Sequence, residues 1–168
     1  MDKSRVLVHI ALFAALTCAL TLFPSFPVGI LPGYIHMGDA VVVLSAYFIG
    51  KKSIVSAAVG SALADVIFAG ALIYVPATLV IKGLMAFVAY LIMNRKPGNL
   101  AVFLLSVLAA ELCMLAGYFL YETALYGAAL AAAAVTAGLA QAAGAIIFSG
   151  VIFKMVKGTN LKKYFQDF

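Results

Sequence analysis

Residues 75–92 read VPATLVIKGLMAFVAYLI, and this stretch indicates the class of protein. Its length suits one helical crossing of a bilayer, which takes roughly 20 mainly apolar residues. Lys82 is its only charged residue, and a charge inside such a segment is costly enough to mark a functional site by default. The other basic residues all lie near the ends of apolar segments, at Lys3, Arg5, Lys51, Lys52, Arg95, Lys96, Lys154, Lys157, Lys162 and Lys163.

The composition of the whole chain agrees with a membrane protein. Of its 168 residues, 66% are hydrophobic and 10% are charged, and the mean hydropathy is +1.16. A soluble domain of this length carries more charge. We therefore expect an all-α integral membrane bundle that forms a single domain over residues 1–168. The net charge of +5 is spread over helix ends rather than one patch, which argues against nucleic acid as a partner.

No sequence pattern indicates a metal or cofactor site. The two cysteines, Cys18 and Cys113, stand within apolar runs and are expected to behave as small buried hydrophobic residues. The sequence has no phosphate-binding loop, no HExxH motif and no Cys/His cluster. We therefore expect no metal, no cofactor and no enzymatic activity.

Six apolar segments predict six transmembrane helices, at about residues 5–23, 38–50, 53–69, 75–93, 100–121 and 131–154. The second segment is short for a full crossing, so it could be completed by the preceding loop, or it could be a tilted or partial span. Lys and Arg occur in alternate connections, and cytoplasmic loops of membrane proteins are enriched in both. This alternation predicts that both termini are cytoplasmic.

The longest connection on the opposite, outer side covers residues 24–37. Three prolines and two glycines exclude a regular helix through it, and it is too apolar for a solvated linker. We expect this connection to fold back over the outer face of the bundle as a candidate lid. An inert extracellular turn is the alternative.

Polar residues from several segments are predicted to lie at one level, in the outer half of the membrane. Such a site can capture a small molecule from outside, whereas an ion pathway needs polar groups along its full length. The alternative for each residue is structural: Lys82 could pair with Asp65 or Glu111, and Asp39 could cap its helix. The candidate binding residues are Tyr34, His36, Asp39, Asp65, Tyr74, Thr78, Lys82, Glu111, Tyr118 and Gln141.

Ala11, Ala15 and Ala19 are four residues apart and therefore share one face of the first helix. A stripe of small side chains allows another helix to approach closely. The approaching helix belongs either to the same bundle or to another protein.

Two stretches carry a resemblance to a known family: GYIHMGDAVVVLSAYFIGKKSIVSAAVGSALADVIFAG (33–70) and YVPATLVIKGLMAFVAYLI (74–92). They resemble the substrate-binding S components of energy-coupling-factor (ECF) vitamin transporters. The matching features are Gly38-Asp39-Ala40, the run over 60–65, and Pro76-Ala77-Thr78 followed by Ile81-Lys82-Gly83. The resemblance covers about residues 5–155.

The resemblance implies a six-helix, multi-pass protein of the bacterial plasma membrane. Such a protein binds one vitamin or precursor near its outer face, under the loop between the first two helices. The resemblance also implies docking through Ala11, Ala15 and Ala19 onto a membrane scaffold (T) subunit. Two cytoplasmic ATPase subunits would drive a toppling motion that carries the site across the membrane.

The most similar subgroup is that of hydroxymethylpyrimidine, pyridoxine or pyridoxamine, and pantothenate carriers. The sequence contains no Trp that could stack on a larger flat ligand, so thiamine or riboflavin is less expected. A small secondary transporter, proton-coupled through Glu111 and Asp65, is the alternative function. The lack of an evident inverted repeat and the apolar inner halves of the helices argue against that alternative.

Overall fold

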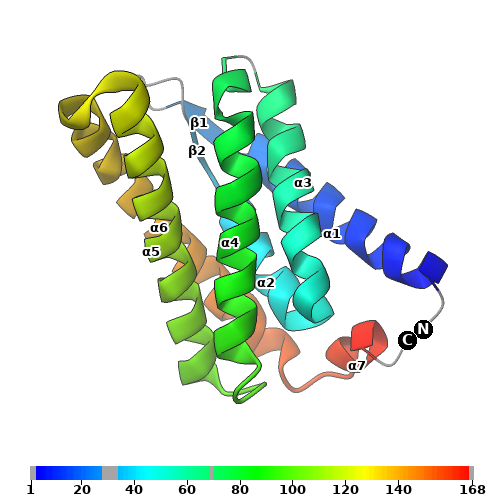
Figure 1. Ribbon diagram of the computed structural model, residues 1–168. Helices are drawn as coiled ribbons and strands as arrows, with labels where there is room; N and C mark the ends of the chain where they lie inside the picture. The colour runs from blue at the N-terminus through cyan, green and yellow to red at the C-terminus, as the bar shows by residue number, and fades with distance from the viewer. Residues whose placement is uncertain (1–2, 28–33, 69, 167–168) are drawn as a thin grey trace.

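The computed structural model describes residues 3–27, 34–68 and 70–166, which form an all-α bundle with one small pair of strands (Figure 1). Two short 3₁₀ turns, Gly50–Lys52 and Leu72–Tyr74, precede α3 and α4. The elements in chain order are α1 (Lys3–Leu22), β1 (Ser25–Pro27), β2 (Tyr34–His36), α2 (Gly38–Ile49), α3 (Ser53–Ile67), α4 (Val75–Met93), α5 (Leu100–Tyr126), α6 (Ala128–Val156) and α7 (Leu161–Gln166).

The short helix α2 lies at the centre of the bundle. All 12 of its residues are buried, and it packs against α1, α3, α4 and α6. A helix of this length is about 18 Å long and covers little more than half of a hydrocarbon core of about 30 Å. The extended strand β2 continues the chain from α2 toward the outer end of the bundle (Figure 1). The second predicted span is therefore a half-length helix that begins below the surface.

The chain reverses between α2 and α3. Gly50 has φ +58°, a left-handed conformation that glycine adopts without strain. The helix α2 runs away from the outer end, and α3 returns to it, where Asp65 near the end of α3 accepts a hydrogen bond from Tyr34. Five apolar segments of the described residues are long enough to cross a membrane, and one of them, Gly38–Ile67, contains this reversal. Six helices among the described residues thus coincide with the six predicted segments, and the prediction that all six cross the membrane is not tested by these five spans.

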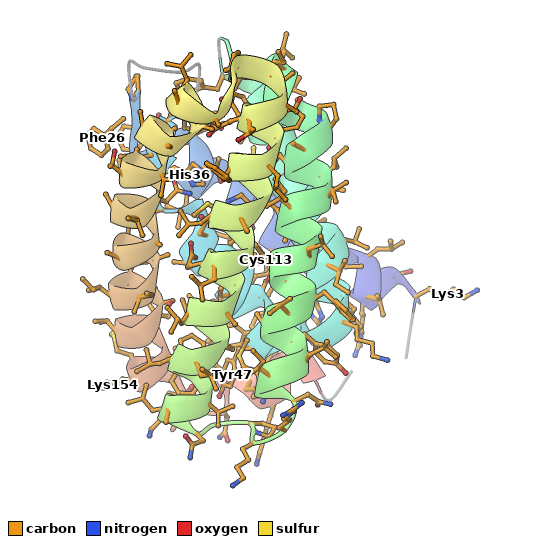
Figure 2. All side chains as sticks on the ribbon, turned by 60° about the vertical axis from the view of Figure 1, so that its left-hand side comes forward. Lys3, Phe26, His36, Tyr47, Cys113 and Lys154 are labelled. Atoms are coloured by element: carbon orange, nitrogen blue, oxygen red, sulfur yellow. The ribbon has the colours of Figure 1, made fainter. Side chains whose placement is uncertain are left out.

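Most of the connections that carry basic residues lie at the end of the bundle opposite the strands, whereas Lys3, at the start of α1, projects from the side at mid-height (Figure 2). In Figure 1 the α2–α3 turn, the α4–α5 connection and α7 all lie at this end, and in Figure 2 Lys154 and Phe26 mark opposite ends. This arrangement is what the alternating connections predict. The assignment of the basic end to the cytoplasm remains a prediction.

The outer connection contains a two-stranded antiparallel pair that the sequence analysis did not predict. Ser25 pairs with His36, and Pro27 pairs with Tyr34. Proline and glycine do exclude a helix here, but they permit short strands, and Pro27 stands at the end of β1, where a missing N–H does no harm. Residues 28–33, in the middle of the candidate lid, lie outside the described residues.

The helix α1 packs closely on α3 through small residues. A Cβ added to Gly60 would lie 2.4 Å from the carbonyl oxygen of Ala14, so only glycine fits at this crossing. The stripe of Ala11, Ala15 and Ala19 lies on the other side of α1, and all three side chains are exposed. The stripe is therefore not used for packing within the described part of the bundle.

The last two long helices extend beyond their predicted ends. The fifth helix was predicted over residues 100–121, and α5 covers Leu100–Tyr126. The sixth was predicted over residues 131–154, and α6 covers Ala128–Val156. Gly127, with φ +87°, is the only break between them, because the Ala-rich segment after it has high helix propensity. The short helix α7 was not predicted. It places Phe165 against the rings of His9, Phe13 and Phe48 at the basic end.

Candidate binding site

A cavity opens between β2 and the outer halves of α4, α5 and α6. Its empty space is about 750 Å³ when the open solvent at its mouth is counted in. Seven of the ten predicted binding residues line it: Tyr34, His36, Asp65, Tyr74, Thr78, Tyr118 and Gln141. The other three, Asp39, Lys82 and Glu111, are buried and do not line the cavity.

Tyr34 of β2 forms part of the cavity wall and is fixed by two contacts. Its ring stacks on Phe68, with centroids 4.0 Å apart and planes at 17°. Its hydroxyl donates a hydrogen bond of 2.8 Å to Asp65 Oδ1. Burial and the neighbouring Asp65 raise the pKa of Tyr34 above its usual range, so the phenol keeps the proton that it donates. The outer connection is thereby attached to the end of α3.

Two hydrogen bonds connect α4 and the 3₁₀ turn before it to α5. The hydroxyls of Thr78 and Tyr118 lie 2.9 Å apart, and Tyr74 donates to Glu122 Oε1 over 3.1 Å. Tyr74 and Tyr118 also contact each other edge to face, with ring centroids 6.1 Å apart. These contacts hold aromatic rings and polar groups side by side, which is the lining expected of a site for a small polar ring compound.

Lys82 forms an ion pair with Asp39, beneath the cavity. The expectation that Asp65 or Glu111 is its partner was wrong. It assumed that the second helix starts at the membrane surface, which would place Asp39 above Lys82. Because α2 begins below β2, at half depth, its first turn instead brings Asp39 to the level of Lys82.

Glu111 of α5 is buried near this pair but makes no contact with it that qualifies as a hydrogen bond. It is 1% exposed, and neither carboxyl oxygen has a hydrogen-bond partner among the described residues. It lies one turn below Met114 and Leu115, which line the cavity. Glu111 therefore belongs to the layer under the site.

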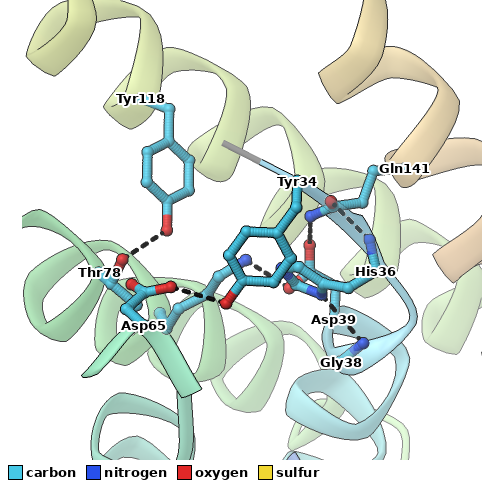
Figure 3. A network of polar contacts seen from close by, with 9 residues as sticks. Tyr34, His36, Gly38, Asp39, Asp65, Thr78, Tyr118 and Gln141 are labelled. Atoms are coloured by element: carbon cyan, nitrogen blue, oxygen red, sulfur yellow. Dashed lines mark hydrogen bonds and ion pairs between the residues drawn. The ribbon is translucent and has the colours of Figure 1, made fainter. Parts of the chain in front are cut away.

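A chain of hydrogen bonds joins the ion pair to β2 (Figure 3). Gln141 Nε2 donates to Asp39 Oδ2 over 2.6 Å, and Gln141 Oε1 accepts the backbone N–H of His36 over 3.2 Å. The His36 ring accepts the backbone N–H of Gly38 at Nδ1, over 3.1 Å. Burial lowers the pKa of His36 to about 4; the charge of Asp39 opposes this shift and the charge of Lys82 adds to it. The imidazole is therefore neutral near neutral pH, and the bond from Gly38 leaves Nδ1 as its unprotonated nitrogen.

Several lining residues were missed by the sequence analysis. Helix periodicity could have found them, because Leu115, Phe119 and Glu122 follow the same face of α5 as Tyr118 at spacings of three and four. On α6, Ala134, Val135, Ala137 and Gly138 precede Gln141 in the same way. They were overlooked because alanine, valine and glycine in a membrane helix carry no signal of their own.

The described residues contain no group of three or more His, Cys, Asp or Glu side chains that could hold a metal ion.

A sequence model of the family described as "ECF-type riboflavin transporter, S component" matches residues 1–158 of the chain. The comparison with curated proteins found no match.

Proposed function

Since the chain belongs to the family of ECF-type riboflavin transporter S components, we propose that its cavity captures one small, flat, nitrogen-containing vitamin or precursor for uptake. Members of this family are multi-pass substrate-binding subunits of the bacterial plasma membrane and are not enzymes. The family implies partnership with a T component and ATPases. The observation that carries the ligand class is the lining of the cavity, which combines aromatic rings with hydrogen-bonding groups.

The aromatic lining supports a planar ligand. Tyr34, Tyr74, Tyr118 and Phe119 come from three different elements and all line the cavity. Aromatic pairs prefer offset-stacked or edge-to-face contacts, which tyrosine and phenylalanine can make with a ring in the same way as tryptophan. The absence of Trp is therefore no argument against a larger ring system, and the objection to riboflavin on that ground loses its force.

The charges of the lining support a neutral or cationic ligand. Asp65 and Glu122 line the cavity, whereas none of its lining residues is Lys or Arg. The nearby ammonium of Lys82 is already paired with Asp39. A ligand carboxylate would thus enter without a cation to pair with, at a cost that grows as water is excluded. Pantothenate, an acid, is on this ground the least favoured of the carriers' ligands considered from the sequence.

Two ligand groups remain, and each has its own support. Riboflavin is the first candidate, because the family description names it. Hydroxymethylpyrimidine and the B6 compounds are the second, because a single ring with hydroxyl or amino donors matches Asp65, Thr78 and Gln141 in the same space.

Calorimetry on the purified subunit with riboflavin, pyridoxine, hydroxymethylpyrimidine and pantothenate tests this proposal. We expect one of the three flat heterocycles to bind tightly and pantothenate not to bind. Mass spectrometry of any compound that co-purifies provides an independent identification. Binding of pantothenate alone, or of none of the four, would contradict the proposed ligand class.

Reconstitution separates this function from the secondary transporter considered above. The subunit alone in proteoliposomes should bind its ligand but not accumulate it under a proton gradient. Accumulation should need the T component, the ATPases and ATP. Uptake by the subunit alone would support proton coupling through Glu111 and Asp65 instead.

A further inference from the structure

Lys82 lies just outside the space available to a ligand. Its side chain is 1% exposed and does not line the cavity. Its Nζ is 5.5 Å from the ring centroid of Tyr118, and Tyr118 does line the cavity. One aromatic side chain therefore separates Lys82 from the ligand, and its charge is already neutralised by Asp39. A role as a ligand contact does not account for this position.

The hydrogen bonds that start at Lys82 can run in one direction only. An ammonium group only donates, and a carboxylate only accepts. Asp39 must therefore receive the amide NH₂ of Gln141, as the 2.6 Å bond from Nε2 shows. This orientation turns Oε1 of Gln141 toward β2, where it accepts the backbone N–H of His36 (Figure 3). The charge of Asp39 thus determines which way the amide points.

This series of hydrogen bonds, from Lys82 through Asp39 and Gln141, ends at β2, the strand that covers the cavity. All three residues of β2 line the cavity, and β2 is held by two side chains, Gln141 at His36 and Asp65 at Tyr34. Lys82, Asp39, Gln141 and His36 are all buried. Removal of one of these side chains therefore leaves its neighbour without a hydrogen-bond partner and weakens the remaining bonds of the series. The position of β2 thereby depends on an ion pair that the ligand does not touch.

We propose that Lys82 and Asp39 are positioning residues that act through Gln141 to hold β2 over the ligand. The proposal rests on the proposed function, in that the cavity is taken to be the vitamin site. The buried ion pair then sets how long the ligand stays bound. Loss of the pair releases β2 and speeds dissociation, while entry into the already open cavity changes little.

Charge rescue provides the test, with riboflavin as the probe and its fluorescence as the signal. Lys82→Met leaves the Asp39 carboxylate unpaired and should raise the dissociation rate at least about tenfold. In Lys82→Met/Asp39→Asn the charge is gone, and the side-chain carbonyl of the introduced asparagine can still accept from Gln141. We expect the dissociation rate of this double variant to return to within about threefold of wild type. Lys154→Met, at an exposed lysine on the basic end, serves as the matched control and should change nothing.

The last link of the chain is tested separately. Gln141→Leu should speed dissociation as Lys82→Met does, and combining the two should add little, because both break one chain. A double variant Lys82→Met/Asp39→Asn as fast as Lys82→Met, or additive effects of Lys82→Met and Gln141→Leu, would overturn the proposal. The first result would mean that the ammonium itself is required, and the second that Lys82 and Gln141 act on the ligand separately.

A second readout needs no ligand. A spin label on Phe26→Cys in β1, with Cys18 and Cys113 replaced by alanine, reports the mobility of the strand pair. The label should become more mobile in Lys82→Met and Gln141→Leu and regain wild-type mobility in the rescued double variant. Unchanged mobility in all variants overturns the proposal.

If riboflavin fails to bind the wild type while mobility follows this pattern, the ligand assignment fails and the positioning role stands. Thermal melting of each variant identifies any that do not fold.

Discussion

At the scale of single residues, His36 combines a structural contact with a group that titrates. Its Nδ1 accepts the Gly38 N–H and cannot do so once protonated. Burial lowers its pKa from 6.5 to about 4, which means that the folded protein resists protonation where an unfolded chain takes up a proton. The pH range between these two values is therefore where His36 affects stability.

We expect the contribution of His36 to the stability of the protein to be lost as the pH falls from 6.5 toward 4. Above pH 6.5 both states are neutral at His36 and the contribution is fully present; below it the unfolded state binds a proton that the folded state excludes. The loss attributable to this group is on the order of 3 kcal/mol. Melting in detergent across this range measures it. His36→Asn supplies a carbonyl acceptor that does not titrate, and it should flatten the pH profile; an unchanged profile would assign the loss to another group.

The residue scale also shows what the sequence could and could not provide. Lys82 was identified because a charge within an apolar run is visible in any sequence. Its partner was misassigned because depth was counted from helix ends that assumed full crossings. Seven of the candidate binding residues line the cavity because polar side chains are rare in such helices and gather where they are needed. Gly138 and Ala134 could not be singled out, since their contribution is space rather than chemistry.

At the scale of elements, apolar runs predicted the helices well and the connections poorly. The segment 75–93 corresponds to α4 because hydrophobic length is set by bilayer thickness. The strands β1 and β2 were missed, since three residues are too few to show an alternating pattern. The helix α7 was missed because LKKYFQ is short and basic, and only its packing of Phe165 on Phe13 and Phe48 reveals a reason for it to fold.

The exposed stripe on α1 leads to a prediction about docking. Ala15→Trp should leave ligand binding by the isolated subunit unchanged and abolish uptake by the full complex, because a bulky ring would keep a scaffold helix at a distance. Calorimetry and radiolabelled uptake measure the two effects. Leu16→Trp, at a neighbouring position that is also exposed but is not part of the stripe, should retain uptake. Loss of binding in Ala15→Trp would instead show that the stripe supports the bundle.

The crossing of α1 and α3 leads to a prediction about stability. Gly60→Ala should destabilise the protein by about 1–3 kcal/mol, because its Cβ would lie 2.4 Å from the Ala14 carbonyl and the helices must separate. Thermal unfolding in detergent measures the change. Gly83→Ala is the matched control, since its added Cβ would meet its neighbours at ordinary contact distances of 3.7–3.8 Å. Equal melting temperatures for the two variants would contradict this description of the crossing.

At the scale of the whole molecule, the distribution of charge predicts the orientation in the membrane. Cysteines at Phe26 and Lys96, in a background without Cys18 and Cys113, report on the two ends of the bundle. A membrane-impermeant maleimide should label position 26 in intact cells and position 96 only after lysis. The reverse pattern would place the cavity on the cytoplasmic side and remove the basis for capture from outside.

The pairing of Lys82 with Asp39 also has an electrical consequence. A single charge that crosses a membrane gains or loses about 2.3 kcal/mol for every 100 mV of potential. Lys82 and Asp39 carry opposite charges and lie in contact, so a movement of the subunit that carries them together does no net work against the field. The ion pair therefore adds nothing to the voltage dependence of such a movement, whereas either residue alone would add to it.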